Sequence, residues 1–158
     1  MPNPRQPAGR AKPPVPGDRG FRHILVPTDL TERTDKALRV AGQLASGASA
    51  RVTLLHVIET IQGLSIDEVK PFYDRLERKA RKAMESLTQR AGGDAPTAAS
   101  VIVHGRRAEE IVKYAAANQV DLIVLASHRV NPSIVDRDWG TISYKVGILA
   151  QCPVLLVK

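Results

Sequence analysis

The sequence predicts an α/β protein with a doubly wound, parallel sheet of five strands. Short runs of apolar and β-branched residues alternate with longer segments whose apolar residues recur every three or four positions. The run 122–126 is continuously apolar, which is typical of a strand buried on both faces of a sheet. Strands separated by helices need right-handed crossovers, so we expect helices on both faces of this sheet.

Two strand–helix units are expected in the first half of the chain. They comprise a strand at residues 21–27, a helix at 31–46, a strand at 52–58 and a helix at 65–91. Gly47 and the Gly92-Gly93 pair supply the stop signals of the two helices. Pro71 is tolerated only in a first turn, so the regular part of the second helix should begin near Val69.

The remaining elements follow the same alternation. They comprise a strand at residues 98–103, a helix at 107–118, a strand at 121–126, a short helix at 140–150 and a last strand at 154–157. A length of 158 residues without an internal repeat favours a single domain.

Composition narrows the class of protein. A single cysteine, Cys152, excludes a disulfide framework and a cysteine-based zinc site. The four scattered histidines show no metal-ligand spacing, so we expect no metal site. The longest apolar run is too short to cross a bilayer, and the proline-rich start lacks the apolar core of a secretory signal. These features predict a cytoplasmic protein that does not bind membranes.

Residues 1–20 are expected to form a flexible arm, and residues 21–158 the folded domain. The arm holds six of the eleven prolines and almost no large apolar side chains, so it cannot offset its ordering entropy by burial. It also carries +3 of the net charge of +7. A basic arm and a basic long helix keep a nucleic-acid-binding module open as an alternative, although aromatics at 4% leave few stacking platforms.

Polar residues gather where the predicted strands end. In open parallel sheets, ligands bind beyond the carboxyl ends of the strands, where the strand order reverses. These ends read Pro27-Thr28-Asp29, His56-Val57, His104 and Ala126-Ser127-His128-Arg129. Asp29 is either an N-cap acceptor or a carboxylate for a ligand hydroxyl. His56 is interpreted as a packed strand residue and His104 as a loop residue near the cleft.

The last predicted helix opens with Gly140-Thr141-Ile142-Ser143. Free backbone N–H groups and two hydroxyls there could hold an anion, or the hydroxyls could simply cap the helix. The usual phosphate loops and the nucleophile elbow are missing from the sequence. No residues read as a nucleophile with its base, so we expect a binding protein without catalytic residues.

Several of these segments carry a resemblance to a known family. They are 22–29 (Arg-His-Ile-Leu-Val-Pro-Thr-Asp), 54–57 (Leu-Leu-His-Val), 103–105 (Val-His-Gly), 121–128 (Asp-Leu-Ile-Val-Leu-Ala-Ser-His) and 152–157 (Cys-Pro-Val-Leu-Leu-Val). Together and in this order, they resemble the universal stress protein family over residues 22–158. The resemblance implies the strand order 3-2-1-4-5, with a switch point between the strands that end near Asp29 and Ala126.

Some members of that family bind ATP, and the resemblance implies where. Asp29 matches the aspartate at the ribose, and Val57 matches the valine at adenine. Of the glycine motif that holds the phosphates only Gly140-Thr141 is kept, because Ala126 and Arg129 replace its first two glycines. Arg129 could block the phosphate or bind it. The Ser-His-Arg start of this loop resembles a subgroup of which some members still bind ATP.

The sequence therefore predicts a homodimeric stress-response protein that binds ATP, with Mg²⁺, as a regulatory ligand. The expected site comprises Pro27, Thr28, Asp29, Val57, Ala126, Ser127, His128, Arg129, Gly140, Thr141, Ile142 and Ser143. Pairing is expected through the apolar last strand, Val154-Leu155-Leu156-Val157, because related proteins pair there and an exposed edge favours it. A ligand-free scaffold protein and a slow self-phosphorylating ATPase using Thr141 or Ser143 stay open as alternatives.

Overall fold

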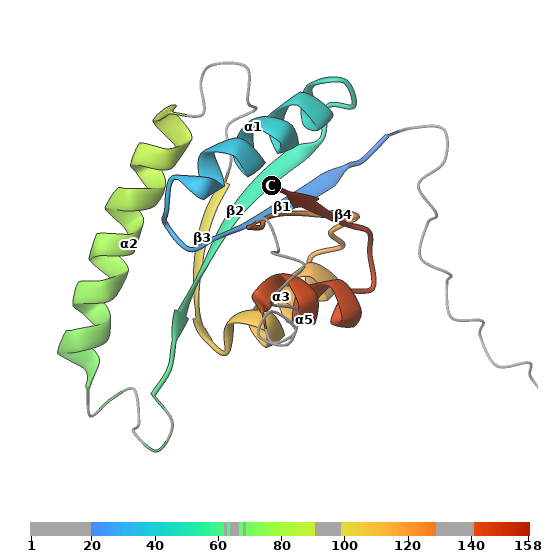
Figure 1. Cartoon of the computed structure of the whole chain (residues 1–158). Coiled ribbons are helices and arrows are strands. Elements are labelled where there is room, and N and C mark those ends of the chain that lie inside the picture. Colours follow the sequence, from blue (N-terminus) through green and yellow to red (C-terminus); the bar gives the residue numbers. More distant parts are fainter. Residues whose placement is uncertain (1–19, 62, 64–66, 68, 91–98, 129–140) are drawn as a thin grey trace, which may run out of the picture.

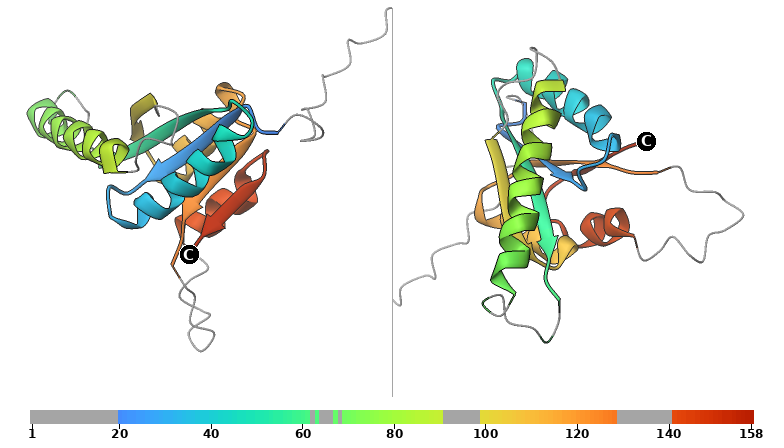
Figure 2. Two further views of the ribbon diagram at one scale, coloured as in Figure 1. Left: turned by 90° about the horizontal axis from the view of Figure 1, so that it is seen from above. Right: turned by 90° about the vertical axis from the view of Figure 1, so that its left-hand side faces the viewer.

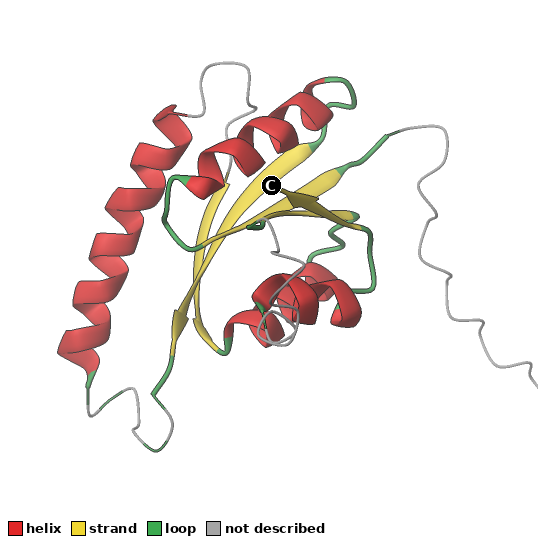
Figure 3. Ribbon diagram, viewed as in Figure 1, coloured by secondary structure: helices red, strands yellow, loops and turns green. Residues whose placement is uncertain are grey.

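The computed structural model describes residues 20–61, 63, 67, 69–90, 99–128 and 141–158. Five strands form one parallel sheet in the order β3-β2-β1-β4-β5 (Figures 1 and 3), which confirms the predicted fold class and strand order. The elements are β1 (His23–Thr28), α1 (Arg33–Ser46), β2 (Arg51–Glu59), α2 (Lys70–Arg90), β3 (Ala99–Gly105), α3 (Arg107–Ala117), β4 (Leu122–Ala126), α5 (Ile142–Leu149) and β5 (Val154–Val157).

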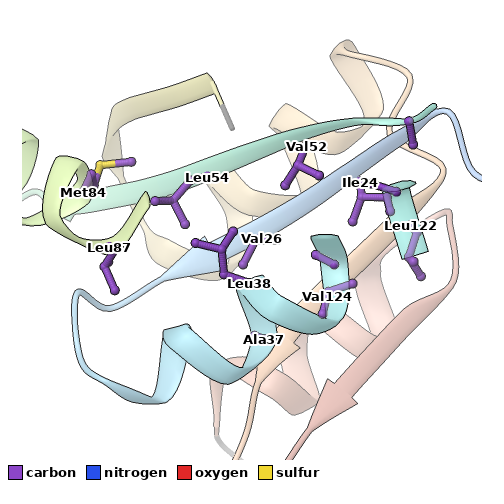
Figure 4. Close-up of a cluster of buried hydrophobic side chains, with 13 residues drawn as sticks. Ile24, Val26, Ala37, Leu38, Val52, Leu54, Met84, Leu87, Leu122 and Val124 are labelled. Atoms are coloured by element: carbon purple, nitrogen blue, oxygen red, sulfur yellow. The ribbon is translucent and has the colours of Figure 1, made fainter. Parts of the chain in front are cut away.

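Helices lie on both faces of the sheet (Figure 2), and an apolar layer holds them to each face. Side chains alternate across each strand, so Ile24 and Val26 face α1 and α2 whereas Leu25 faces α3 and α5. Figure 4 shows the first layer, where Leu38 of α1 and Met84 of α2 pack onto β1 and β2. Helices on both faces explain why β4 is a continuous apolar run and why every residue of β1 is buried.

The central strands separate at one end of the sheet. β1 pairs with β2 from His23 to Thr28, but it pairs with β4 only through Ile24 and Leu25. Pro27 has no N–H to donate. Because it lies beyond the last β1–β4 pair, no hydrogen bond between these two strands is lost there. A crevice therefore opens at the carboxyl ends of β1 and β4.

Some predicted boundaries and burial patterns were wrong. The helix expected from residue 31 begins at Arg33, and the helix expected from residue 140 begins at Ile142. At the start of α2, Phe72 is 43% exposed, because the buried face of this helix runs through Tyr73, Ala80, Met84 and Leu87. His104 lies within β3 and not in a loop.

The predicted arm falls outside the described residues apart from Gly20, so the arm and the domain boundary stay predictions. Within the part of the chain that is described, no helix has both the length and the apolar character needed to cross a bilayer. The six basic side chains of α2 between Lys70 and Lys82 are exposed. Two of them pair with carboxylates one turn away, Lys70 with Asp74 and Arg81 with Glu77. This is the pattern of a solvated helix face.

Candidate functional site

A pocket lies in the crevice where β1 and β4 separate. It is lined by Pro27, Thr28, Asp29, Arg33, Thr34, Leu55, Val57, Arg107, Ile111, Leu125, Ala126, Ile142 and Ser143. The hollow contains about 590 Å³ of empty space, and part of that space is open solvent. The carboxyl ends of three neighbouring strands thus converge on one hollow, at the switch point of the sheet.

Seven of the twelve residues expected at a site line this pocket: Pro27, Thr28, Asp29, Val57, Ala126, Ile142 and Ser143. Ser127 and His128 are described but are not among the lining residues, and the Ser127 N–H donates to the Val157 carbonyl at the β5 edge. Thr141 caps α5, since its Oγ1 accepts the Tyr144 N–H at 3.3 Å. Arg129 and Gly140 lie outside the described residues.

Asp29 shapes the loop between β1 and α1. Its Oδ1 accepts hydrogen bonds from the Thr31 N–H at 3.0 Å and the Thr31 hydroxyl at 2.6 Å. The N-cap of α1 is Glu32, whose side chain makes no cap bond, so the N-cap interpretation of Asp29 was wrong. Burial alone would raise the pKa of Asp29, but the Thr31 bonds and the positive charge of Arg33 outweigh it and lower this pKa. Asp29 therefore presents an ionised carboxylate.

Buried hydroxyls hold the same loop in place. Thr28 Oγ1 lies 2.8 Å from Thr34 Oγ1 and accepts the Leu30 N–H at 2.9 Å. This bond helps to keep Leu30 at φ +65°, a conformation that side-chain-bearing residues rarely adopt. His56 Nδ1 lies 2.9 Å from the Thr28 carbonyl, which agrees with its interpretation as a packed strand residue. The rim of the pocket is thus fixed before any ligand arrives.

The floor of the pocket is apolar. Leu55 and Val57 from β2, Leu125 from β4 and Ile111 from α3 belong to one buried cluster, and Ile142 packs against it. An apolar floor beside an ionised carboxylate suits a flat, partly apolar ligand that also carries hydroxyl groups.

Two arginines at the pocket were not found from the sequence. Arg33 is the first residue of α1 and Arg107 the first of α3, and both line the hollow. Arg107 Nη2 lies 2.7 Å from Glu59 Oε2 at the end of β2. The signal was their position directly after strand-end loops, but both lie inside segments that read as ordinary helices.

Gly105 makes the turn that brings Arg107 to the pocket. Its φ is +148°, in the region that favours glycine, and a Cβ there would lie 2.6 Å from Cγ of Glu110. The β3–α3 turn can therefore be this tight only with glycine at its corner.

The described residues offer no metal site, and His104 is not part of the pocket. No three His, Cys, Asp or Glu side chains within the described ranges are placed to hold a metal ion. His104 packs edge-to-face against Tyr73, with ring centroids 5.6 Å apart, and its buried Nε2 finds no hydrogen-bond partner in the described part of the chain. His104 thus belongs to the α2–β3 packing and not to the pocket.

The family model for universal stress proteins matches residues 20–158. The chain belongs to the universal stress protein family. The universal stress protein YxiE of Bacillus subtilis is 28% identical over 151 residues, covering 87% of this chain and 99% of the relative. A universal stress protein of Methanothermobacter thermautotrophicus is 31% identical over 144 residues, covering 87% of this chain and 96% of the relative.

Solved structures of the family share the fold. The universal stress protein UspA from Lactobacillus plantarum superposes with a TM-score of 0.73 at 26% identity, covering 89% of this chain and all of that one. Two more distant structures are complexes, one of a universal stress protein with cAMP (TM-score 0.58, 22% identity) and one from Archaeoglobus fulgidus with dAMP (TM-score 0.60, 17% identity). They cover 88% and 87% of this chain, and their likeness to it is a likeness of fold.

Proposed function

We propose that this universal stress protein binds an adenine nucleotide, ATP, as a regulatory ligand in the stress response. The observation that carries the proposal is the pocket itself, where an apolar floor, an ionised Asp29 and two arginines meet at the switch point of the sheet. These are the three kinds of group that a base, a ribose and a phosphate require.

In the proposed pose, the adenine ring lies on the apolar floor next to Val57. A ribose hydroxyl donates to Asp29, whose low pKa keeps it an acceptor at neutral pH. Mg²⁺ enters with the phosphates, because no cluster in the described part of the chain is placed to hold it alone. The cAMP and dAMP complexes support the proposal only as examples of adenine nucleotides held by proteins of this fold.

We propose binding without catalysis. The Thr28 hydroxyl is bonded to Thr34, and Thr141 accepts a backbone N–H, so both are engaged within the protein. The Thr28 and Thr34 hydroxyls at the pocket bond to each other, and Thr28 Oγ1 also accepts the Leu30 N–H, so these bonds engage no general base. An unchanged intact mass after incubation with ATP and Mg²⁺ is the expected result, and an added phosphoryl group would contradict it.

The decisive experiment measures nucleotide binding directly. Denaturing freshly purified protein should release adenine nucleotide, and calorimetry of the stripped protein should show binding of ATP. Asp29→Asn keeps an acceptor oxygen for Thr31 but loses the charge, and should weaken ATP binding about tenfold. Asp74→Ala, a carboxylate change on α2 away from the pocket, is the matched control. No heat with ATP, ADP or AMP would refute the proposal and leave a ligand-free scaffold protein.

We also propose that the protein forms a homodimer through β5. We place this dimer in the cytoplasm, because a chain with one cysteine does not depend on a disulfide framework. β5 lies at the edge of the sheet, and its Leu155 and Leu156 are 38% and 41% exposed. Beside them α5 exposes Ile148 and Leu149. A second copy covering this edge would bury apolar surface and pair open backbone groups. Light scattering at micromolar concentration should give the dimer mass, and a monomer mass would refute this part.

A further inference from the structure

We propose that Arg33 and Arg107 form a phosphate clamp, so that the affinity of the pocket depends on the charge of the nucleotide. The inference rests on the proposed function and names the part of the ligand that these two side chains hold. Both arginines line the pocket, and they come from opposite faces of the sheet, Arg33 from α1 and Arg107 from α3. An anion in the crevice would therefore have a guanidinium available from either side.

The position of each arginine argues for a ligand. Each is the first residue of its helix, where the positive end of the helix dipole makes a cation unfavourable. A phosphate bound at the same place makes the position of the arginine favourable. The free N–H groups of the helix start and the guanidinium then attract the same anion. Ile142 and Ser143, which open α5, line the same hollow, so three helix starts converge on it.

The two arginines differ in what else they contact. Within the described residues Arg33 forms no ion pair, and its charge acts on Asp29, whose pKa it helps to lower. Arg107 pairs with Glu59, but both side chains are about half exposed, so this pair is screened by solvent. Glu59 is not a lining residue of the pocket, and it competes with a ligand phosphate for Arg107.

The test compares ligands that differ only in phosphate. Adenosine, AMP and ATP are titrated into the full chain and into Arg33→Gln and Arg107→Gln, with tripolyphosphate as the phosphate-only probe. Each variant should bind ATP about tenfold more weakly than the wild type, with adenosine binding unchanged within about twofold. Wild-type protein should bind tripolyphosphate at least about tenfold more weakly than ATP, because the floor contributes through adenine.

Matched controls separate the clamp from general charge. Arg39→Gln on α1 and Arg106→Gln before α3 remove a cation that does not line the pocket, so ATP binding should stay within about twofold. Glu59→Gln should act in the opposite direction and strengthen ATP binding about two- to threefold, because it frees Arg107. All five sites are at the surface, so circular dichroism should show folded protein in each case.

Failure of the clamp is distinguishable from failure of the proposed function. If the wild type binds adenosine and ATP but Arg33→Gln and Arg107→Gln behave like their controls, the clamp is refuted and the nucleotide site stands. If no adenine compound binds, the proposed function falls and the clamp with it. Equal binding of tripolyphosphate and ATP would overturn adenine recognition and leave a simple polyphosphate site.

Discussion

His23 should make the stability of this protein fall as the pH is lowered below neutral. Its ring is buried at the start of β1, with Nε2 2.9 Å from Thr53 Oγ1 and Nδ1 2.9 Å from Arg51 Nη2. Nδ1 also lies 3.0 Å from the Asn118 carbonyl, to which Arg51 Nη2 donates at 3.2 Å. The position of the ring proton decides whether Nδ1 accepts from Arg51 or donates to the Asn118 carbonyl, and the Thr53 hydroxyl can bond to Nε2 in either case.

Protonation is unfavourable in the folded protein, because it places a positive charge on a buried ring beside the Arg51 guanidinium. Burial lowers the pKa of His23 below its ordinary value of about 6.5, and the Arg51 charge acts in the same direction, against the raising effects of Asn118 and Asp121. The unfolded chain therefore binds a proton near its ordinary pKa while the folded chain does not. The free energy of unfolding should be unaffected above that pKa and should fall below it, by up to about 1.4 kcal/mol per pH unit.

Urea unfolding of the wild type and of His23→Gln between pH 7.5 and pH 5 measures this contribution. His23→Gln should be less stable at neutral pH, because it loses the packed ring. The difference between the two proteins should then shrink as the pH falls, because only the wild type loses stability through His23. A difference that stays constant across this pH range would refute the argument that burial lowers the pKa of His23.

Three further changes test the core, a turn and the edge strand. Leu38→Ala should lower the free energy of unfolding by about 3 kcal/mol because Leu38 is fully buried, whereas Leu44→Ala on the exposed side of α1 should cost under about 1 kcal/mol in the same urea titration. Gly105→Ala should cost about 1–3 kcal/mol, since alanine is strained at this φ and meets Glu110, and an unchanged unfolding midpoint would contradict this. Leu156→Lys places a charge on the β5 edge and should convert the proposed dimer to a folded monomer by light scattering, so a persistent dimer mass would place the interface elsewhere.

The location of the site could be predicted from the sequence because it depends on topology. Alternation of strands and helices puts every strand's carboxyl end at one edge, so Asp29, Val57 and Ala126 were grouped without knowledge of any contact. The roles of single side chains could not be predicted in the same way. Asp29 follows a strand and precedes a helix, as an N-cap does, yet the turn through Thr31 moves the helix start to Arg33.

Long-range contacts account for most of what the sequence did not indicate. The His23 ring meets Thr53 and Asn118, which are 30 and 95 positions away, and periodicity carries no information about such meetings. On α2, Phe72 and Tyr73 are neighbours of similar apolar character, and only the packing of α2 against the sheet decides which is buried. Arg33 and Arg107 come together at the pocket for the same topological reason as the strand ends, but both sit in segments whose other residues indicate helix.

The balance of charge at the pocket limits how strongly it can hold a nucleotide. Asp29 offsets Arg33, and Glu59 already neutralises Arg107, so a phosphate must replace or join existing partners. The exchange is favourable because a phosphate accepts two parallel bonds from a guanidinium, whereas an exposed pair such as Arg107–Glu59 contributes only about 0–1 kcal/mol. Binding of this kind is screened by salt, since the charges lie near the surface. ATP affinity should therefore fall as salt is raised from low to physiological concentration while adenosine affinity should not, and parallel salt curves for the two would mean that neither arginine holds the phosphates.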